Sequence, residues 1–478
     1  MKKRIPILFV ILIAILTATP KSKAQEQRAD TSDFDRRVES TVNQIFQRFD
    51  EQYGTYIFTD EPSPRSEQTE SDESCDSPSV KHRRQQHRWF GDGQSSFFAS
   101  TPDNFIHRNS TILYPWFPVD DDVLFRYNRV EGLFLGLNSP KQYHWEGRHI
   151  NLFGSAGYGF AFHRWRYGGG IANQFGRGNR IFELGVEGHS LTDTPDQWIV
   201  GDEENNLAAL LLRDDYRDYY SREGASLWTA LYLRSGCTDA QVRAAYLIDR
   251  YGSLDRNTNW SLFGGDKVFR DNPPINDGDM RSMLVSIDVH NSAQRRYMIT
   301  GWSAAASAEF GGKAFRGDFD FNRYIVDVRR YQPLSDYDNI NIRLRASSLT
   351  GDIVLQKMFG LGGFSTIPAF AFKEFNGNRM LLANAEYVVN GKLFDESGIP
   401  AWALRNFNVI LFFDAGYAAM AQTTDAILAG FNNLGSSTIK SDWGLGFGTR
   451  DGKMRLGFAW RTDVAEPVRV FLRIDRPF

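Results

Sequence analysis

The sequence predicts an all-β fold, a 16-stranded antiparallel transmembrane β-barrel, preceded by a short N-terminal helix and a disordered linker. Three observations lead to this prediction. The chain begins with an export signal, its apolar residues alternate with polar ones over strand-length segments, and it ends on a strand whose last residue is aromatic. After the signal, no stretch is apolar for the ~20 residues that a transmembrane helix needs.

Residues 1–24 have the pattern of a removable signal peptide. A basic start, MKKR, precedes the apolar run IPILFVILIAIL, which is too short to span a bilayer. Ser22 and Ala24 supply the small residues that signal peptidase requires before Gln25. Loss of the five Lys and Arg residues of this peptide takes the formal net charge from −3 to −8. The acidic mature chain disfavours a nucleic-acid partner.

Residues 25–115 predict a periplasmic extension. Apolar residues at helical spacing predict one amphipathic helix at about 33–52. The next stretch, TDEPSPRSEQTESDESCDSPS, is acidic and rich in Ser and Pro, so it cannot bury enough apolar surface to fold. The basic run KHRRQQHRWF then has two interpretations, docking to anionic lipid and a solvated linker that balances the acidic run. The linker interpretation is favoured.

Residues 116–478 alternate as membrane strands do. In VRVFLRIDRPF, Val470, Leu472 and Ile474 fall on one face and arginines on the other. The segments KMRLGFAWR, RSMLVSIDVH and NINIRLRASS repeat the rule. A soluble β-sandwich is the alternative. Strand lengths near the ~9–11 residues that cross a membrane favour the barrel, as do the aromatics expected in its interface girdles, namely Trp165, Trp228, Trp302 and Trp443.

Sixteen candidate strands follow along the chain, an even number as bacterial barrels require. They lie near 123–136, 150–160, 164–175, 180–189, 225–234, 240–251, 259–264, 281–290, 301–311, 323–332, 339–349, 380–389, 406–417, 442–449, 453–461 and 468–478.

Strand parity assigns the connections to the two sides of the membrane. With both barrel ends in the periplasm, the outward segments are 138–149, 235–239, 265–280, 312–322, 350–379, 418–441 and 462–467. The long segment 190–224 is then periplasmic. This places Cys75 in the periplasmic linker and Cys237 at an outward turn, so we predict two free thiols despite an oxidising compartment.

Five motifs in the C-terminal half occur in a fixed order: GLGG, FKEFNGNRMLLANAEY, FFDAG, WGLGFGTRDGKMRLGFAW and the terminal RPF. Together they make residues 120–478 resemble the bacterial surface antigen superfamily, the BamA-like outer-membrane β-barrels, in a short form lacking POTRA domains. The resemblance implies that the sixth outward loop, 350–379, folds back into the lumen as a plug.

The resemblance departs from the family at the tip of this loop. The family reads Val/Leu-Arg-Gly-Phe/Tyr there, and its arginine pairs with the Asp of the FDxG strand. This chain has Pro368, Ala369 and Phe370, so the usual lumenal ion pair with Asp414 cannot form. Residues 25–115 also have neither the length nor the composition for a POTRA domain.

Asp414 nevertheless needs a partner in a confined lumen, because an unpaired buried charge is costly. Lys373 and Arg379 are the candidate cations in the loop and at the start of the next strand, with Glu374 and Glu386 sharing the lumenal cluster. The alternative is a wet lumen in which Asp414 is hydrated, and the two interpretations have equal weight.

The first strand, LFRYNRVEGLFLG, indicates a weak seam with the last strand. Arg126 and Arg129 lie on opposite faces of one strand, so a charge meets lipid or a gap in either register. A lipid-facing charge near the midplane costs about 2–4 kcal/mol. The seam residues are then Arg126, Arg129 and Glu131 on the first strand, and Leu472 and Ile474 on the last.

Enzymatic functions are disfavoured. The eight histidines are dispersed, and neither HExxH nor GxSxG occurs. In GLGFGTRDG, the glycines at 444, 446 and 448 alternate along a strand, where small residues leave room for an inserted loop. We expect no catalytic residue, cofactor or metal.

Two function classes remain. The first is an accessory role in outer-membrane biogenesis, meaning protein or lipid assembly or translocation through the weak seam. The second is a closed barrel that acts as a passive pore or as a platform for another envelope protein. The expected location is the cell outer membrane of a Gram-negative bacterium. The expected partners are outer-membrane lipid and lipopolysaccharide, together with an envelope protein or a second copy in a homodimer.

Phe478 is the expected assembly signal, because the resemblance implies that the aromatic chain end is read by the assembly machinery. Phe478→Ala should leave export across the inner membrane intact and reduce barrel assembly, measured as heat-modifiable protein on gels of isolated outer membranes. Normal amounts of heat-modifiable protein would contradict this prediction.

Overall fold

The computed structural model describes residues 123–295, 298–393, 407–422, 426–449 and 454–474. The chain divides into two compact units, Met1–Glu73 and Ser74–Phe478, and the described residues all belong to the second. The predictions for the signal peptide, the extension at 25–115 with its helix, Cys75 and Phe478 therefore lie outside the described residues.

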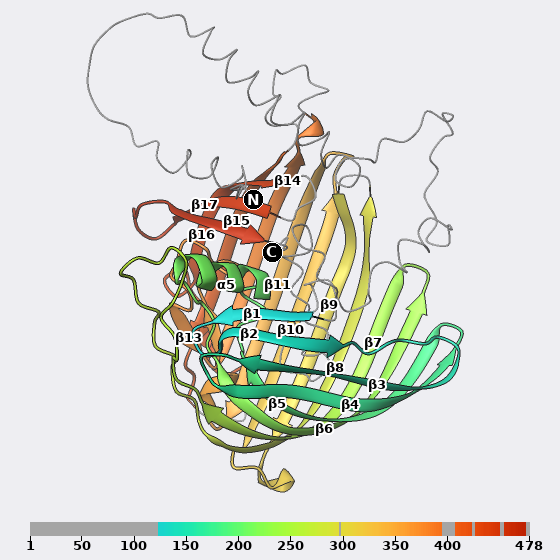
Figure 1. The fold of residues 1–478 in the computed structure, drawn as a ribbon. Coiled ribbons are helices and arrows are strands. Elements are labelled where there is room, and N and C mark those ends of the chain that lie inside the picture. Colours follow the sequence, from blue (N-terminus) through green and yellow to red (C-terminus); the bar gives the residue numbers. More distant parts are fainter. Residues whose placement is uncertain (1–122, 296–297, 394–406, 423–425, 450–453, 475–478) are drawn as a thin grey trace, which may run out of the picture. The chain divides into compact units, whose positions relative to one another are not determined.

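Sixteen strands form one antiparallel sheet whose order follows the chain (Figure 1). They are β1 (Val123–Asn128), β2 (Gly132–Ser139), β3 (Gly147–Gly159), β4 (Arg164–Arg177), β5 (Arg180–Asp193), β6 (Tyr220–Ser235), β7 (Thr238–Ser253), β8 (Gly278–Arg295), β9 (Met298–Gly311), β10 (Phe321–Pro333), β11 (Asp338–Gly351), β14 (Arg379–Asn390), β15 (Phe407–Ala419), β16 (Lys440–Thr449), β17 (Met454–Arg461) and β18 (Arg469–Ile474). The predicted 16-stranded antiparallel fold is confirmed.

The remaining elements lie in the connections. Helix α5 (Asp202–Leu207) continues as the π-helical turn η2 (Ala208–Leu212) between β5 and β6. A two-stranded sheet, β12 (Phe359–Leu361) and β13 (Phe375–Gly377), lies between β11 and β14. Single 3-10 turns are η3 (Lys313–Phe315), η4 (Leu355–Lys357) and η6 (Phe431–Asn433). Among the described residues, no helix is long and apolar enough to cross a membrane.

The strands expose their apolar residues and bury their charged ones. Along β5, the side chains of Phe182, Leu184 and Val186 are 46 to 49 % exposed, whereas the alternating Glu183 and Glu187 are 0 and 6 % exposed. A soluble sandwich would do the reverse, because it buries apolar residues between its sheets. The pattern is that of a membrane barrel with a polar interior.

Three of the four predicted girdle tryptophans face outward. Trp165, Trp302 and Trp443 are 47 to 62 % exposed. Trp228 is 1 % exposed, and its indole nitrogen donates to the Glu183 carboxylate at 2.8 Å. The prediction is therefore wrong for Trp228, which occupies an inward position of β6 and supports the polar interior.

The predicted strand count is right because two errors cancel. The segment 123–136 is two strands, since Asn128 Oδ1 accepts from the backbone nitrogens of Val130 and Glu131 and the chain reverses before Gly132. Asn-x-x-x-Gly is a readable turn signal that the alternation concealed. The predicted strand at 259–264 lies instead in the β7–β8 connection.

Each error changes by one the number of strands that precede a connection, and this number decides on which side of the sheet the connection lies. The sides assigned to the connections between the two errors are therefore wrong. Antiparallel pairing places the β5–β6 connection, residues 194–219, on the same side of the sheet as the β11–β14 connection, residues 352–378. We call this side the loop end, and the other the turn end. The segment 190–224 is thus outward when 350–379 is outward, whereas 138–149 and 235–239 lie at the turn end.

Cys237 corrects the thiol prediction. It lies in the β6–β7 turn and is disulfide-bonded, so the prediction of a free thiol there is wrong. The parity error explains the mistake, because this turn lies at the turn end, where the chain ends are expected. Cys75 is the other cysteine of the sequence and lies outside the described residues.

Surface tagging tests the corrected parity. An epitope inserted after Gly265 should be labelled by antibody on intact cells, and one inserted after Gly178 only after permeabilisation. Both glycines have positive φ, at +54° and +61°, and no heavy atom lies within 4 Å of an added Cβ at either, so insertions are tolerated equally. Labelling of the Gly178 tag on intact cells would overturn the corrected topology.

Candidate functional site

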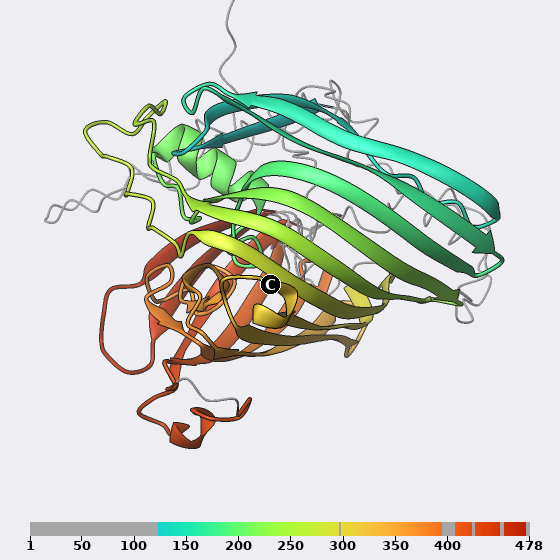
Figure 2. The ribbon, with the colours of Figure 1, turned by 90° about the horizontal axis from the view of Figure 1, so that it is seen from below.

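The seam of the sheet lies between β1 and β18. In the described residues these strands are the two ends of the sheet order, and no ladder joins them. Helix α5 packs against both strands and lies between them (Figures 1 and 2). We call residues 202–212, which comprise α5 and η2, the wedge helix.

Local sequence explains why the wedge helix forms. Gly201 has an extended backbone at the N-cap, and its nitrogen donates to the Glu204 carboxylate at 3.1 Å. Acidic residues in the first turn lie near the positive end of the helix dipole, and this stabilises the helix. Arg213, with φ +59°, ends the helix in a left-handed conformation. The signal GDEENNLAALLL is readable in the sequence, but the sequence analysis did not identify this helix.

Side chains of the wedge helix satisfy backbone amides at both sheet edges. Asn206 Oδ1 accepts from the Tyr127 nitrogen of β1 at 3.1 Å. Glu204 Oε1 accepts from the Ile474 nitrogen of β18 at 2.7 Å and from Arg473 Nε at 3.2 Å. An edge strand presents unpaired amides that a neighbouring strand normally satisfies. Here a helix takes that place.

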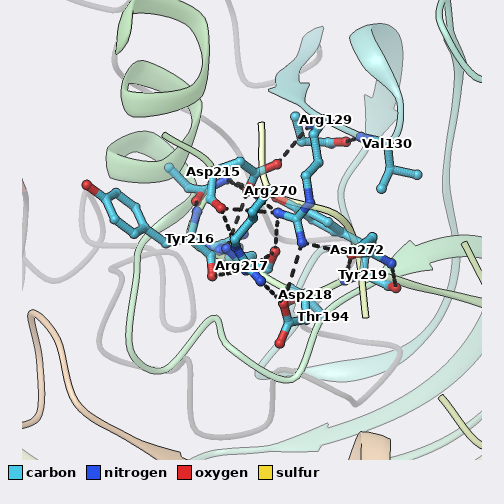
Figure 3. Close-up of polar contacts among 12 residues, drawn as sticks. Arg129, Val130, Thr194, Asp215, Tyr216, Arg217, Asp218, Tyr219, Arg270 and Asn272 are labelled. Carbon is cyan, nitrogen blue, oxygen red and sulfur yellow. Dashed lines mark hydrogen bonds and ion pairs between the residues drawn. The ribbon is translucent and has the colours of Figure 1, made fainter. Parts of the chain in front are cut away.

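A buried polar network anchors the segment that carries the wedge helix to the β1–β2 turn (Figure 3). Arg129 is 0 % exposed, and its backbone nitrogen donates to Asp215 Oδ2 at 2.8 Å. Its guanidinium donates to the Arg217 carbonyl at 2.6 Å and to Asn272 Oδ1 at 2.9 Å. Every one of these contacts is buried, so this end of the segment is held firmly.

The predicted opposition of Arg126 and Arg129 is wrong. Arg126 is on the inner face, where it pairs with Glu131 at 3.0 Å and stacks over Phe134 at 3.8 Å. Arg129 lies in the turn beyond β1. Neither charge meets lipid, so the sequence argument for a weak seam fails, although the structure supplies another. Leu472 is 42 % exposed on the outer face of β18, which Ile474 shares.

The sixth outward loop enters the barrel interior, as the resemblance implied. Residues 352–378, the plug loop, bury Ile367, Ala369 and Phe370 to 5 % exposure or less within the main apolar cluster. The Ala369 nitrogen donates to Asp442 Oδ2 of β16 at 2.7 Å. The Thr366 carbonyl accepts from Asn384 of β14 at 2.8 Å. Backbone groups of the loop tip therefore bond to inward side chains of the strands.

The structure brings together Pro368, Glu386 and Asp414, which line one cavity beneath the loop tip. Asp414 accepts from Asn384 Nδ2 at 2.7 Å. Glu386 pairs with Arg455 of β17. The cations of this cavity are Arg455 and Arg473, which sequence reasoning did not assign to the lumen. Their inward positions in alternating strands were the available signal.

The loop-borne charges are placed elsewhere. Lys373 pairs with Asp196 at 2.9 Å and Asp218 at 2.6 Å, both in the β5–β6 connection. Glu374 accepts locally from the Ala371 nitrogen at 2.8 Å. Arg379 donates to the carbonyls of Ala429 at 2.7 Å and Ala426 at 3.1 Å. The expectation that these three side chains share a cluster with Asp414 is therefore wrong.

Charge balance around Lys373 favours the ionised pairs. Burial by itself lowers the pKa of Lys373, but the carboxylates of Asp196 and Asp218 outweigh it and raise the pKa. Burial opposes ionisation of Asp218 as well, and Lys373 with Arg270 nevertheless lowers its pKa. The pKa of Asp196 is raised, because its burial prevails over Lys373. Asp196 is thus the weaker of the two carboxylate partners.

Within the described ranges, no group of three or more His, Cys, Asp or Glu side chains is arranged to hold a metal ion.

Comparisons with known proteins find similar solved structures only. No family model matches, and no curated protein matches by sequence. BamA from Haemophilus ducreyi lacking POTRA domains 1-3 is 11 % identical with a TM-score of 0.44, covering 73 % of this chain and 67 % of that one. CdiB from Acinetobacter baumannii is 12 % identical with a TM-score of 0.37, covering 71 % and 55 %. The outer membrane protein opdK from Pseudomonas aeruginosa is 13 % identical with a TM-score of 0.28, covering 71 % and 90 %. These values assign neither a family nor a role.

Removing Arg455 tests whether it replaces the loop-tip arginine. Arg455→Gln leaves the buried Glu386 without its cation, so we expect the free energy of unfolding in detergent to fall by about 3–5 kcal/mol. Arg250→Gln is the matched control, because Arg250 pairs with Asp279 at 2.8 Å with 74 % of its side chain exposed, and such pairs contribute ~0–1 kcal/mol. Equal losses in both variants would contradict the assignment.

Proposed function

We propose that this protein is an outer-membrane barrel of a Gram-negative bacterium with an accessory role in outer-membrane biogenesis. It assists the assembly or translocation of protein or lipid through the seam between β1 and β18. One observation carries the proposal. In the described residues the two end strands are not paired with each other, and their edge amides bond to side chains of the wedge helix.

The seam is the least costly strand junction to open. In the described residues no ladder joins β1 to β18, whereas β3 and β4 are paired from Gly147 with Gly176 to Gly159 with Arg164. A long ladder holds many backbone hydrogen bonds, each contributing about 0.5–1.5 kcal/mol. Side-chain contacts of a short helix can be exchanged without breaking such a ladder. An opened seam exposes edge amides that must find new partners, and an incoming strand supplies them.

The alternative is a closed barrel that acts as a passive pore or as a platform. The plug loop disfavours the pore, because its residues at the tip are buried against inward side chains of β14 and β16. A platform remains compatible with the exposed loop end. Outer-membrane lipid and lipopolysaccharide are the proposed surroundings, and an envelope protein or a second copy is the proposed partner.

Covalent closure of the seam tests the proposal. Cysteines at Phe125 and Leu472, on the outer faces of β1 and β18, would be joined in cells by a bismaleimide long enough to span the wedge helix. We expect joined protein to lose its effect on the levels of other outer-membrane proteins or of surface lipopolysaccharide, measured against a chromosomal deletion.

The matched control replaces Leu137 and Ala156 by cysteine and joins them with the same bismaleimide. These positions are register partners in the ladder between β2 and β3, so their joining restrains strands that are already paired. Loss of function in the control would mean that cross-linking itself is harmful. Full function after verified closure of the seam would refute the biogenesis role and favour the platform.

A further inference from the structure

We propose that residues 194–219, here named the latch segment, are a hinged latch that closes the seam, stays attached to β1, releases β18, and is held shut by Lys373 of the plug loop. This inference rests on the proposed function, because it describes how the seam of that function is regulated.

The latch segment is far longer than the connection requires. Adjacent antiparallel strands of this sheet are joined elsewhere by two-residue turns, at 178–179 and at 236–237. Structured connections longer than about 12–15 residues usually have a function of their own. Here the extra residues carry the wedge helix from the loop end to the two edges of the seam.

The attachments of the latch segment are unequal on the two sides. On the β1 side, Arg129 joins Asp215, the Arg217 carbonyl and Asn272 through buried hydrogen bonds of 2.6 to 2.9 Å. Ala209 also packs in an apolar cluster with Tyr127 of β1 and Phe269.

On the β18 side, the Glu204 carboxylate accepts from Ile474 and Arg473 in the described part of β18. Removal of this acceptor therefore weakens the attachment to β18. The attachment to β1 would require a whole buried network to break. Opening is expected between the wedge helix and β18, with the β1–β2 turn as the hinge.

Lys373 connects the latch segment to the plug loop at two points. Its ammonium bonds to Asp196, which precedes the wedge helix, and to Asp218, which follows it. The Ser365 hydroxyl of the plug loop also donates to the Ile199 carbonyl at 2.6 Å. Tyr216 of the latch segment packs edge-on against Phe364, with ring centroids 4.8 Å apart. Movement of the plug loop thus removes the cation that holds both arms of the latch segment.

Loss of Lys373 should therefore act like movement of the plug loop. Without the ammonium, the buried carboxylate of Asp196 loses its ion pair and repels that of Asp218, which keeps its pair with Arg270 at 2.6 Å. Lys373→Met removes the charge and keeps the length of the side chain, and Lys373→Arg keeps the charge. Both variants retain an L side chain at φ +52°, so backbone strain at this position is matched.

Two cysteine pairs report the two sides of the latch segment separately. Leu207→Cys with Ile474→Cys reports the β18 side, because Leu207 follows Glu204 by one helical turn and the Glu204 carboxylate stays in place. Asn206→Cys with Tyr127→Cys reports the β1 side, where the Arg129 network stays in place. Each pair is built into the full chain in its membrane and treated with a short bifunctional thiol reagent. The yield of cross-linked protein is then measured. In Lys373→Met, we expect the β18-side yield to fall by on the order of tenfold. The β1-side yield should stay unchanged, and Lys373→Arg should behave as the parent.

A β18-side yield that is unchanged in Lys373→Met overturns the inference, as does a parallel fall of both yields, which would mean that the latch segment has no hinge. If Lys373→Met fails to assemble as heat-modifiable protein, the single variant Asp196→Asn removes one of the two ion pairs of Lys373, leaves Asp218 paired with Arg270, and must also lower the β18-side yield. The yields do not depend on any biogenesis activity. If the latch segment is released while outer-membrane assembly in the cells stays normal, the proposed function is refuted and the latch inference is retained.

Discussion

The constraint on which the rest of this structure depends is that a backbone amide at a sheet edge in a membrane must find an acceptor. Fifteen strand junctions satisfy it by antiparallel ladders. At the seam between β1 and β18, the wedge helix supplies Asn206 and Glu204 instead. Because side chains replace a neighbouring strand there, the seam can be closed without being permanently paired.

The lumen shows how a missing charge can be replaced from another element. Pro368 occupies the loop-tip position where the resembling family has an arginine. The acidic groups around it are satisfied by Arg455 for Glu386, by Asn384 for Asp414, and by the Ala369 nitrogen for Asp442. The cation that pairs with Glu386 lies on the strand wall, in β17. The tip of the plug loop holds the wall through its backbone, and Lys357 of the same loop pairs with Glu309 of β9 at 2.8 Å. Lys373 pairs with the β5–β6 connection.

The plug loop, the segment that carries the wedge helix and the last strand are therefore joined by direct contacts. Lys373 pairs with two carboxylates of the β5–β6 connection, Phe364 packs between Tyr216 and Phe471, and Arg473 lies beside Glu204. The plug loop therefore contacts both the β5–β6 connection and β18.

The sequence by itself determined the antiparallel sheet and its two faces, because lipid outside and polar groups inside impose a period of two that can be read residue by residue. Its strand number was right only because two errors cancelled. It also indicated the inserted loop and the grouping of Glu386 with Asp414. The side assignments were wrong because the alternation of apolar and polar residues continues through the turn at Asn128, so two strands were predicted as one. That error placed 190–224 and Cys237 on the wrong side of the sheet. The partners of Lys373, Arg129 and Arg455 were decided only by the tertiary structure. Each long cation reaches acids on elements that are distant in the chain, and no local pattern records which of several carboxylates it pairs with once the sheet has curved.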